Sequence, residues 1–491
     1  MGMAGSLVRH IPLSLLYAAV DSLKQGFEVD ILDTRLDPAH WERDLVALMT
    51  PETLMVGVSV MTGAPIRNAL NISKRVKELY PNLPVVWGGP HCTFNGEEVL
   101  GEDCVDYVVA GYGSQPMASL AARLANRPGA PDFAAIPGLI YREGAGIRAV
   151  PPVPAFEVLD HRDIPYHLVE RHLGSYGQLD NGERIFPLFS AMGCPYQCAF
   201  CSSPAQYREI RPKYRLIPVA DVVDHIEFVH QRYGATYIYF IDDDSFVRPD
   251  HVEAIIDELR RRGLSLKLGF RGARINELKR MSDAFLSKLA DAGTNIMHIG
   301  AESGSPRMLK LIRKNCTVED IIEVNRKMAR HPEIKTAYNW IVGLPGETLE
   351  DLRMTRELTL RMIEENPSAV MFMPNKFRPL PGTELYERAL EMGYRKPVHL
   401  LEWTEGEAEG DFRPPWYSAA FADMINMMQI TSFFIDDKLF KVETGGTLRF
   451  RVLQLLAWLY KPFALLRYRF GISAALLEYK VFYLFTSSFR T

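Results

Sequence analysis

Short apolar runs alternate with helix-like stretches through the first part of the chain, up to about Ala130. Between Ile66 and Tyr80, apolar residues recur every three or four positions with basic residues among them, which is the pattern of an amphipathic helix. Alternation of strands with helices predicts a doubly wound parallel sheet of the α/β class. The predicted strands are Val29–Leu32, Leu54–Val60, Leu83–Trp87 and Tyr107–Ala110.

Turns of glycine and small residues follow three of these strands. In open α/β sheets, ligands bind beyond the carboxyl ends of the strands, and glycine allows a ligand to approach the backbone closely. A sheet that only packs against a neighbouring domain would also explain such turns. The candidate binding positions are Ser59, Thr62, Gly88, Gly89, Gly111 and Gly113.

A second succession of strands and helices runs from Arg184 to Pro397. An apolar stripe from Val219 to Val229 ends before Gly234, and Thr317 with Asp320 forms a capping box, so these helices have clear limits. Six strand-helix units predict a partial (β/α)6 barrel, whose functional residues should lie at the carboxyl ends of its strands. The predicted strands are Ile185–Ser190, Tyr237–Ile241, Leu266–Phe270, Ile296–Ala301, Thr336–Val342 and Ala369–Phe377.

Two less regular segments complete the chain. Residues 131–183 are rich in proline and are predicted to form an extended linker with a short hairpin near Gly138. Residues 398–491 are predicted to form a mainly helical extension, basic and rich in aromatic residues from Lys441 onward. Amphipathic helices that cover the barrel explain this composition, and so does contact with a membrane surface. The predicted domains are therefore residues 1–130, 184–397 and 398–491, with 131–183 as the linker.

Composition narrows the class of protein. The chain is 47% hydrophobic and 24% charged, which is ordinary for a soluble globular protein, and its 491 residues suffice for two or three domains. The net charge of −4 gives no general attraction to nucleic acid. We find neither a signal-peptide pattern nor a run of about 18 apolar residues, and we expect a cytoplasmic protein without a membrane-spanning helix.

Three of the six cysteines lie in one short stretch, as Cys194, Cys198 and Cys201. This C-x3-C-x2-C spacing favours a metal site over disulfide bonds. Zinc usually takes four ligands, and no fourth cysteine or nearby histidine has a suitable spacing. Three thiolates can instead hold three irons of a cubane cluster, which leaves the fourth iron open to a substrate.

Polar residues follow the other predicted barrel strands. Charged groups in a cleft are costly unless they have partners, so their recurrence at one rim predicts a shared polar ligand. Structural explanations remain open. The acidic segment Asp242–Ser245 would suit the start of a helix, and Glu302 could form an ion pair with Arg274 or Arg271. The polar segments are Asp242–Ser245, Arg271–Arg274, Glu302–Gly304 and Gly343–Thr348.

The cysteine loop resembles that of the radical S-adenosylmethionine (SAM) superfamily, and the glycine turns resemble the cobalamin-binding Rossmann domain that precedes many radical SAM cores. Two departures concern the first domain: its usual first strand is absent, and no D-x-H-x-x-G motif provides a histidine ligand for cobalt. The resemblance implies a [4Fe-4S] cluster on the three cysteines and cobalamin at the six glycine-turn positions. It also implies SAM contacts at Phe200, Asp242, Asp243, Arg274, Glu302 and Gly343.

The resemblance further implies reductive cleavage of SAM to a 5′-deoxyadenosyl radical, which abstracts hydrogen from an unactivated carbon of a small, hydrophobic substrate. Cobalamin would then deliver a methyl group. An electron donor such as flavodoxin or ferredoxin would reduce the cluster. The alternatives are a radical SAM cyclase, dehydratase or rearrangement enzyme without methyl transfer, and a non-catalytic iron–sulfur sensor. We expect a cytoplasmic enzyme, with peripheral membrane contact through the C-terminal extension as the alternative to helices that only cover the barrel.

Overall fold

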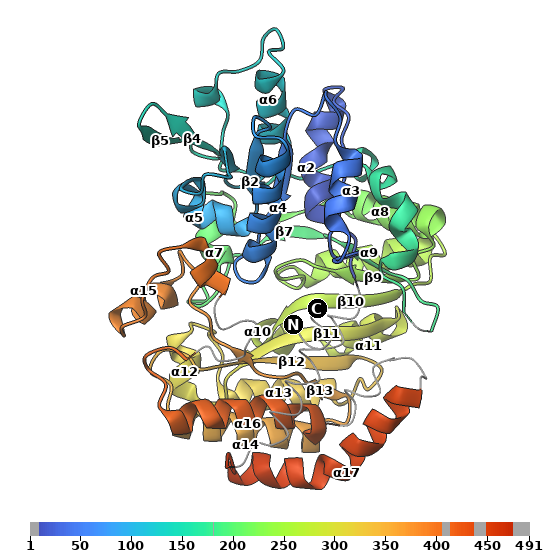
Figure 1. The fold of residues 1–491 in the computed structure, drawn as a ribbon. Helices are drawn as coiled ribbons and strands as arrows, with labels where there is room; N and C mark the ends of the chain where they lie inside the picture. Colours follow the sequence, from blue (N-terminus) through green and yellow to red (C-terminus); the bar gives the residue numbers. More distant parts are fainter. Residues whose placement is uncertain (1–8, 180, 405–412, 437–447, 475–491) are drawn as a thin grey trace.

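The structure is a computed structural model that describes residues 9–179, 181–404, 413–436 and 448–474. A smaller sheet with its helices lies at one end of the molecule, a larger sheet lies in the middle, and the last helices lie at the other end (Figure 1). The fold is therefore α/β, with a Rossmann-like first part, a barrel-like core and a helical extension, as the sequence predicts.

The first sheet has the order β1-β2-β3-β4-β5, in which β1, β2 and β3 are parallel and β4 and β5 are antiparallel. The β4–β5 hairpin falls in the segment that we expected to be a linker, and it extends this sheet through its pairing with β3. The bounds are β1 Val56–Ser59, β2 Val85–Gly88, β3 Tyr107–Val109, β4 Leu139–Glu143 and β5 Gly146–Ala149.

The strand predicted at Val29–Leu32 is wrong, because this segment has no regular structure. Its apolar character has another cause. Ile31 is buried and belongs to the large core cluster that also contains residues of the second sheet, such as Leu188 and Ile238. An apolar run shows that a segment is buried, but not whether its backbone joins a ladder.

Helices cover both faces of the first sheet. On one face, Val85 and Trp87 pack with Ile66 of α4. On the other face, Val86 packs with Leu120 of α6, and α2 lies against α6. The helices are α2 Leu13–Lys24, α3 Trp41–Leu48, α4 Pro65–Leu79, α5 Pro90–Leu100 and α6 Ser114–Leu124, followed by the 3-10 turns η1 Phe133–Ala135, η2 His161–Asp163 and η3 Tyr166–Ser175.

The second sheet has six parallel strands in the order β6-β9-β10-β11-β12-β13. The predicted sixth strand is divided into β13 and β14, which both pair with β12, and Pro374 lies in the interval. Proline has no N–H group for a ladder, so the interruption is expected there. The strands are β6 Ile185–Leu188, β9 Tyr237–Phe240, β10 Lys267–Arg274, β11 Thr294–Glu302, β12 Lys335–Val342, β13 Ala369–Met371 and β14 Asn375–Lys376, with the separate pair β7 Ala191–Gly193 and β8 Tyr214–Leu216.

Helices connect the strands of the second sheet. Two of them begin or end where a capping residue or a glycine in the sequence predicts it. The helix α8 ends at Gly234, which has a φ of +67°, and α13 begins with the predicted capping box of Thr317 and Asp320. The helices are α7 Ser203–Gln206, α8 Val219–Tyr233, α9 Pro249–Arg261, α10 Ile275–Arg280, α11 Asp283–Asp291, α12 Pro306–Leu311, α13 Val318–Met328, α14 Leu349–Glu365 and α15 Glu384–Glu391.

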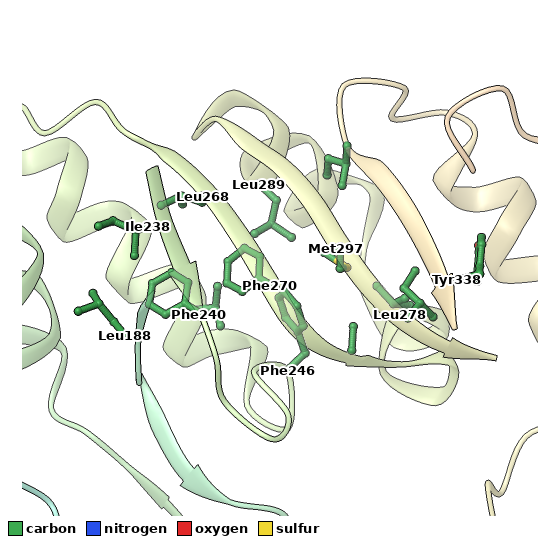
Figure 2. Close-up of a cluster of buried hydrophobic side chains, with 14 of the residues drawn as sticks. Leu188, Ile238, Phe240, Phe246, Leu268, Phe270, Leu278, Leu289, Met297 and Tyr338 are labelled. Carbon is green, nitrogen blue, oxygen red and sulfur yellow. The ribbon is translucent and has the colours of Figure 1, made fainter. Parts of the chain in front are cut away.

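Aromatic side chains fill the core between these strands and helices. Figure 2 shows Phe240, Phe246 and Phe270 grouped together. The rings of Phe240 and Phe270 lie 5.1 Å apart, and those of Phe246 and Phe270 lie 4.8 Å apart. Dense packing of this kind holds the strand ends rigidly, and it is at these ends that the polar segments lie.

The described part of the extension contains η4 Leu400–Thr404, α16 Ala419–Ile435 and α17 Leu448–Phe470. The helices α14, α16 and α17 contact one another, and Ile425 and Met428 of α16 share a core cluster with Leu352 of α14 and Tyr468 of α17. No helix within the described residues is long and apolar enough to cross a membrane.

Candidate functional site

The three cysteines of the C-x3-C-x2-C stretch lie on the loop between β7 and α7. Backbone hydrogen bonds fasten this loop on two sides: Ala199 N–H donates to Ile312 O at 3.0 Å, and Leu385 N–H donates to Ala199 O at 3.0 Å. All six cysteines of the chain are free. The loop is therefore held from the ends of two different helices, and its thiols remain available as ligands.

The chemistry of the cysteine loop fits an iron–sulfur cluster. Burial raises the pKa of Cys194 to about 12 and also raises the pKa of Cys201, so iron must displace their protons. Among the described residues, no three Cys, His, Asp or Glu side chains converge on one ion position. In a cubane each thiolate binds a different iron, so the ligands stand farther apart than around one ion.

Arg274, at the end of β10, lies directly against the cysteine loop. Its Nη1 donates to Cys198 Sγ at 2.9 Å, and its Nη2 donates to Lys314 O at 2.7 Å. The guanidinium carbon lies 4.0 Å from the ring centroid of Tyr196. Its Nε is buried without a hydrogen-bond partner among the described residues, so one donor remains for a ligand such as the SAM carboxylate.

Glu302, at the end of β11, pairs with a lysine that the sequence analysis did not single out. Lys314 Nζ donates to Glu302 Oε1 at 2.8 Å, so the ion-pair partner of Glu302 is neither Arg274 nor Arg271. Burial alone would lower the pKa of Lys314, yet the Glu302 carboxylate raises it above its usual value. Glu302 has a φ of +65°, and a side chain at Gly300 would overlap both charged groups.

In the acidic segment after β9, Asp242 is buried and Asp243 is exposed. Asp242 is buried and accepts hydrogen bonds from Ser190 N at 2.7 Å, Ser190 Oγ at 2.6 Å and Ala191 N at 3.1 Å. Burial raises its pKa to about 6. Asp243 is exposed and accepts from Ser203 Oγ at 3.2 Å, beside the cysteine loop. Asp242 thus fastens β6 to β9, and Asp243 is the better candidate for a ligand contact.

The Gly343 turn after β12 is covered by the C-terminal extension. Trp416 Nε1 donates to Gly343 O at 3.0 Å, and a Cβ on Gly343 would overlap the Tyr417 hydroxyl. Glu347 closes the turn by accepting from Leu344 N at 3.1 Å. The Tyr417 hydroxyl and Glu347 Oε1 are both buried without a hydrogen-bond partner among the described residues.

Phe200 is half-buried and packs against the main core near the cysteines.

The candidate cobalamin positions lie at the carboxyl ends of β1, β2 and β3. Ser59 is exposed, as is Met61 with 54% of its surface, so the end of β1 is open. Thr62 Oγ1 lies 3.1 Å from His91 Nδ1. The imidazole of His91 is buried and packs on Trp403, so it does not face this open edge. Hydroxyls and backbone N–H groups at an open edge suit the amide-bearing rim of a corrin.

Glycine is required at the Gly89 turn, between β2 and α5. Gly89 has a φ of +100°, and a Cβ there would lie 2.8 Å from Val60 O. Gly88 has only ordinary contacts with Val109. At the end of β3, Gly111 packs on Pro152 and Gly113 on Ala18. The β3 turn is thus in contact with other segments, whereas the β1 and β2 turns contact each other and form the open β1–β2 edge.

The two sheets meet near the cysteine loop. Tyr112, at the end of β3, packs with Phe156 and Tyr207, and Tyr207 follows α7 directly after the cysteines. Phe94 of α5 and Ala205 of α7 likewise both lie close to Gly382 of the second part. The carboxyl edges of both sheets are therefore turned toward one region, where α5 and α7 are neighbours (Figure 1).

Several residues of this region escaped prediction, including Tyr112, Tyr196, Tyr207, Lys314 and Trp416. Lys314 follows α12 in a stretch where Arg313 and Asn315 have positive φ values of 54° and 59°. Charged residues after a helix are common on surfaces, so the sequence carries no signal that this lysine is buried.

Two family matches account for the two sheets. Residues 189–359 match the Radical SAM superfamily, and residues 3–121 match the B12 binding domain. The first range contains the three cysteines, Arg274, Glu302 and Gly343, and the second contains all six glycine-turn positions.

Curated relatives and solved structures are similar over most of the chain. The uncharacterized methyltransferase PH0819 of Pyrococcus horikoshii is 27% identical over 393 residues, which is 78% of this chain and 81% of that protein. The anaerobic magnesium-protoporphyrin IX monomethyl ester cyclase of Rubrivivax gelatinosus is 26% identical over 343 residues, which is 69% of this chain and 59% of that cyclase. The cobalamin-dependent S-adenosylmethionine radical enzyme OxsB, with aqua-cobalamin bound, has a TM-score of 0.72 at 14% identity, over 95% of this chain and 71% of that chain.

The OxsB likeness shows a shared fold, and the family matches assign both cofactor domains. The cysteine loop, the parallel strands behind it and the glycine turns agree with that assignment. The chain therefore belongs to the radical SAM enzymes that carry a cobalamin (B12)-binding domain.

Proposed function

We propose that this enzyme methylates an unactivated carbon of a small, hydrophobic substrate. The observation that carries the proposal is the meeting of the two carboxyl edges: Tyr112, after β3 of the first sheet, packs with Tyr207, which follows the cysteine loop and α7. A methyl donor on the first sheet and a radical source on the second then face the same substrate. Several relatives are named methyltransferases or, in one case, a methylase, which supports this reading.

When bound, the cluster and SAM supply a 5′-deoxyadenosyl radical and cobalamin supplies a methyl group. The protein's own part is to hold these groups in position and to exclude water, since the cofactors carry the difficult chemistry. Cys194, Cys198 and Cys201 would hold the cluster. Arg274 would offer its buried Nε, which has no hydrogen-bond partner among the described residues, to the SAM carboxylate, and Glu302, held by Lys314, would accept from the ribose hydroxyls.

The remaining SAM contacts in our proposal are Asp243, Phe200 and the Gly343 turn. Asp243 is exposed beside the cysteine loop and can accept from the SAM amino group. Phe200 and the Gly343 backbone would flank the adenine. We keep Asp242 as a residue that positions this rim, because its carboxylate is already bound to Ser190 and Ala191.

A rearrangement enzyme without methyl transfer is the second candidate. Cyclases of magnesium-protoporphyrin IX monomethyl ester are among the relatives, at 24–27% identity. Their likeness supports ring closure driven by the same radical. A non-catalytic iron–sulfur sensor is less well supported, because a sensor has no need for Glu302, Arg274 and Asp243 around an open iron.

The proposal also includes an electron donor and a location for the enzyme. Reduction of the cluster requires a one-electron donor, for which a flavodoxin or ferredoxin has the right chemistry. We also propose that the enzyme works in the cytoplasm and that its C-terminal extension contacts the membrane periphery.

The test uses the full-length protein, reconstituted anaerobically with iron, sulfide and hydroxocobalamin, then supplied with dithionite and SAM deuterated in its methyl group. Methyl transfer predicts S-adenosylhomocysteine and label in the extracted corrin, together with 5′-deoxyadenosine. Deoxyadenosine without S-adenosylhomocysteine would favour rearrangement, and neither product would favour a sensor. Failure to bind cobalamin would exclude methyl transfer. The variant Cys198→Ala should lose deoxyadenosine and keep cobalamin binding.

A further inference from the structure

The strands of the second sheet have a face that is turned away from the core in Figure 2. Phe240 and Phe270 belong to that core, and side chains alternate along a strand. Their neighbours Tyr239 and Arg271 therefore lie on the opposite face, which we call the inner face. His298 of β11 lies there too, because its ring centroid is 6.1 Å from that of Tyr239 and the charge of Arg271 acts on both groups.

Four rings form a row on the inner face. His10 stacks on Tyr239, with 6.1 Å between the ring centroids. His298 stacks on Phe372, with 5.3 Å between the centroids, and meets Tyr239 edge to face. Burial, aided by the charge of Arg271, lowers the pKa of His298 to about 4 and also lowers the pKa of His10. The row is therefore uncharged near neutral pH.

A β-bulge places Arg271 beside this row. In the register of β10 with β11, Arg271 and Gly272 together stand opposite the single residue His298. The segment after β9 fixes the bulge: Ser245 N–H donates to Gly272 O at 3.1 Å, and a Cβ on Gly272 would lie 2.6 Å from Asp243 O. Bulges are common next to active sites, where they redirect a side chain.

Arg271 has no anionic partner in the part of the chain that the structure describes. Its guanidinium is exposed and makes no hydrogen bond or ion pair with a described residue. The titratable groups that its charge reaches are the neutral side chains of His10, Tyr239 and His298. The ring nitrogens of His298 likewise have no hydrogen-bond partner among the described residues. Both side chains thus keep their donors for a ligand.

We propose that Arg271 and His298 bind an anionic group of the substrate, a carboxylate or a phosphate, and that the ring row carries the apolar part of the same molecule. A guanidinium can bind either anion through two parallel N–H groups, and a neutral imidazole adds one donor. The rings of Tyr239 and Phe372 suit an apolar or aromatic body. The inference rests on the function proposed above and gives its hydrophobic substrate an anionic end.

The inner face leads directly to the proposed ribose contact. His298 lies two residues before Gly300 on β11, which is about 7 Å along the strand. A Cβ on Gly300 would overlap the side chains of Glu302 and Lys314, so this ion pair stands on the same face as His298. An anion held by Arg271 therefore keeps the rest of the substrate on the face where we propose that SAM binds.

The carboxylate of SAM is the other anion expected at this rim, and Arg274 is better placed for it. Arg274 donates to Cys198 Sγ at 2.9 Å. Among the described residues, no hydrogen bond joins Arg271 to the cysteine loop. Arg271 is therefore the cation that remains for a second anion.

Binding of three naphthalene probes to the full-length protein tests the inference. The protein is reconstituted anaerobically and saturated with SAM, without a reductant. The probes are 1-naphthoate, 1-naphthyl phosphate and the neutral 1-naphthamide, and equilibrium dialysis gives their dissociation constants. We expect at least one anion to bind, and Arg271→Met to lower its affinity at least tenfold while naphthamide binding stays the same. The anion that binds more tightly identifies the group. Arg260→Met changes an exposed arginine of α9 and is the matched control.

The variant His298→Phe keeps a ring against Phe372 and removes the ring nitrogens. It should lower the affinity for the anion and retain naphthamide binding. Three results would overturn the inference: neither anion binds the parent protein, Arg271→Met binds the anion as well as the parent or no worse than Arg260→Met, or Arg271→Met loses SAM affinity, which would assign Arg271 to the SAM carboxylate. Without a reductant these readouts do not depend on methyl transfer. Anion binding that depends on Arg271, in an enzyme that transfers no methyl group, would refute the proposed function alone.

Discussion

The ammonium group of Lys314 lies 2.8 Å from Oε1 of Glu302, and less than a tenth of either side chain is exposed. The pair lies beside Arg274, whose Nη2 donates to the backbone oxygen of Lys314. A buried carboxylate keeps its charge only when a cation or several donors stabilise it. Lys314 therefore fixes the position of the Glu302 side chain, which we propose as the acceptor for the ribose hydroxyl groups of SAM.

Replacement of Lys314 by methionine should leave Glu302 buried without its cation. Removal of one partner of a buried ion pair typically costs about 3–5 kcal/mol, so we expect a loss of this order in the free energy of unfolding. SAM affinity should fall at least tenfold. Urea unfolding and equilibrium dialysis with labelled SAM measure the two effects. The control is Lys310→Met, which changes an exposed lysine of α12.

The double variant Lys314→Met/Glu302→Gln separates stability from binding. It has no unpaired buried charge, so it should regain much of the stability that the single variant loses. SAM affinity should remain low, since the Glu302 carboxyl group and the lysine that positions it are both gone. Normal SAM affinity in the double variant would show that the pair has a structural role only.

Loss of one cysteine of the loop should prevent assembly of the cluster. We expect Cys194→Ala, Cys198→Ala and Cys201→Ala each to lose most of the iron and the visible absorption of the reconstituted protein. Cys104→Ala is the control, because Cys104 is a buried free thiol in the core of the first sheet. If the three loop variants retained as much iron as Cys104→Ala, the cluster assignment would be wrong.

Much of this fold could be predicted because its signals are local. The period of apolar residues identified α4 and α8, and the capping box of Thr317 identified the start of α13. The three cysteines of the loop likewise lie within eight residues of sequence. The segment Val29–Leu32 shows the limit of such signals, since Ile31 is buried by contacts with another domain rather than by a ladder.

The partners within the site could not be predicted, because they come from distant segments. Tyr417 meets Gly343 across 74 positions of sequence, and its contact depends on how the extension folds back over the rim. Arg274 reaches Cys198 across 76 positions. No pattern in either segment specifies the other, and only the packed structure brings them together.

Burial of Glu347 should make the stability of the protein depend on pH. Burial raises the pKa of Glu347 to about 8, whereas its ordinary value is 4.5. Between pH 4.5 and 8 the folded protein keeps a proton on Glu347 that the unfolded chain has lost. The contribution of this protonation to the free energy of unfolding is therefore complete below pH 4.5 and is lost as the pH rises through 8.

Glu347→Gln removes this titration and keeps a carbonyl acceptor for Leu344 N–H. The free energy of unfolding of the variant, minus that of the parent, should rise by up to about 1.4 kcal/mol per pH unit between pH 4.5 and 8. Chemical unfolding at several pH values measures this difference. Glu350→Gln changes an exposed glutamate of the following helix, α14, and should give a flat difference over this pH range. A flat difference for Glu347→Gln as well would mean that Glu347 is ionised in the folded protein.

The Gly89 turn should be necessary for cobalamin binding at the open β1–β2 edge. With a φ of +100° at this position and Val60 O only 2.8 Å from a Cβ, Gly89→Ala must displace the turn. We expect cobalamin affinity to fall at least tenfold in a spectroscopic titration. Gly144→Ala has a similar backbone requirement, with a φ of +62° in the β4–β5 hairpin, but open space around its Cβ. It should bind cobalamin like the parent protein, so a shared loss would indicate general destabilisation, and parental affinity in Gly89→Ala would remove this turn from the cobalamin site.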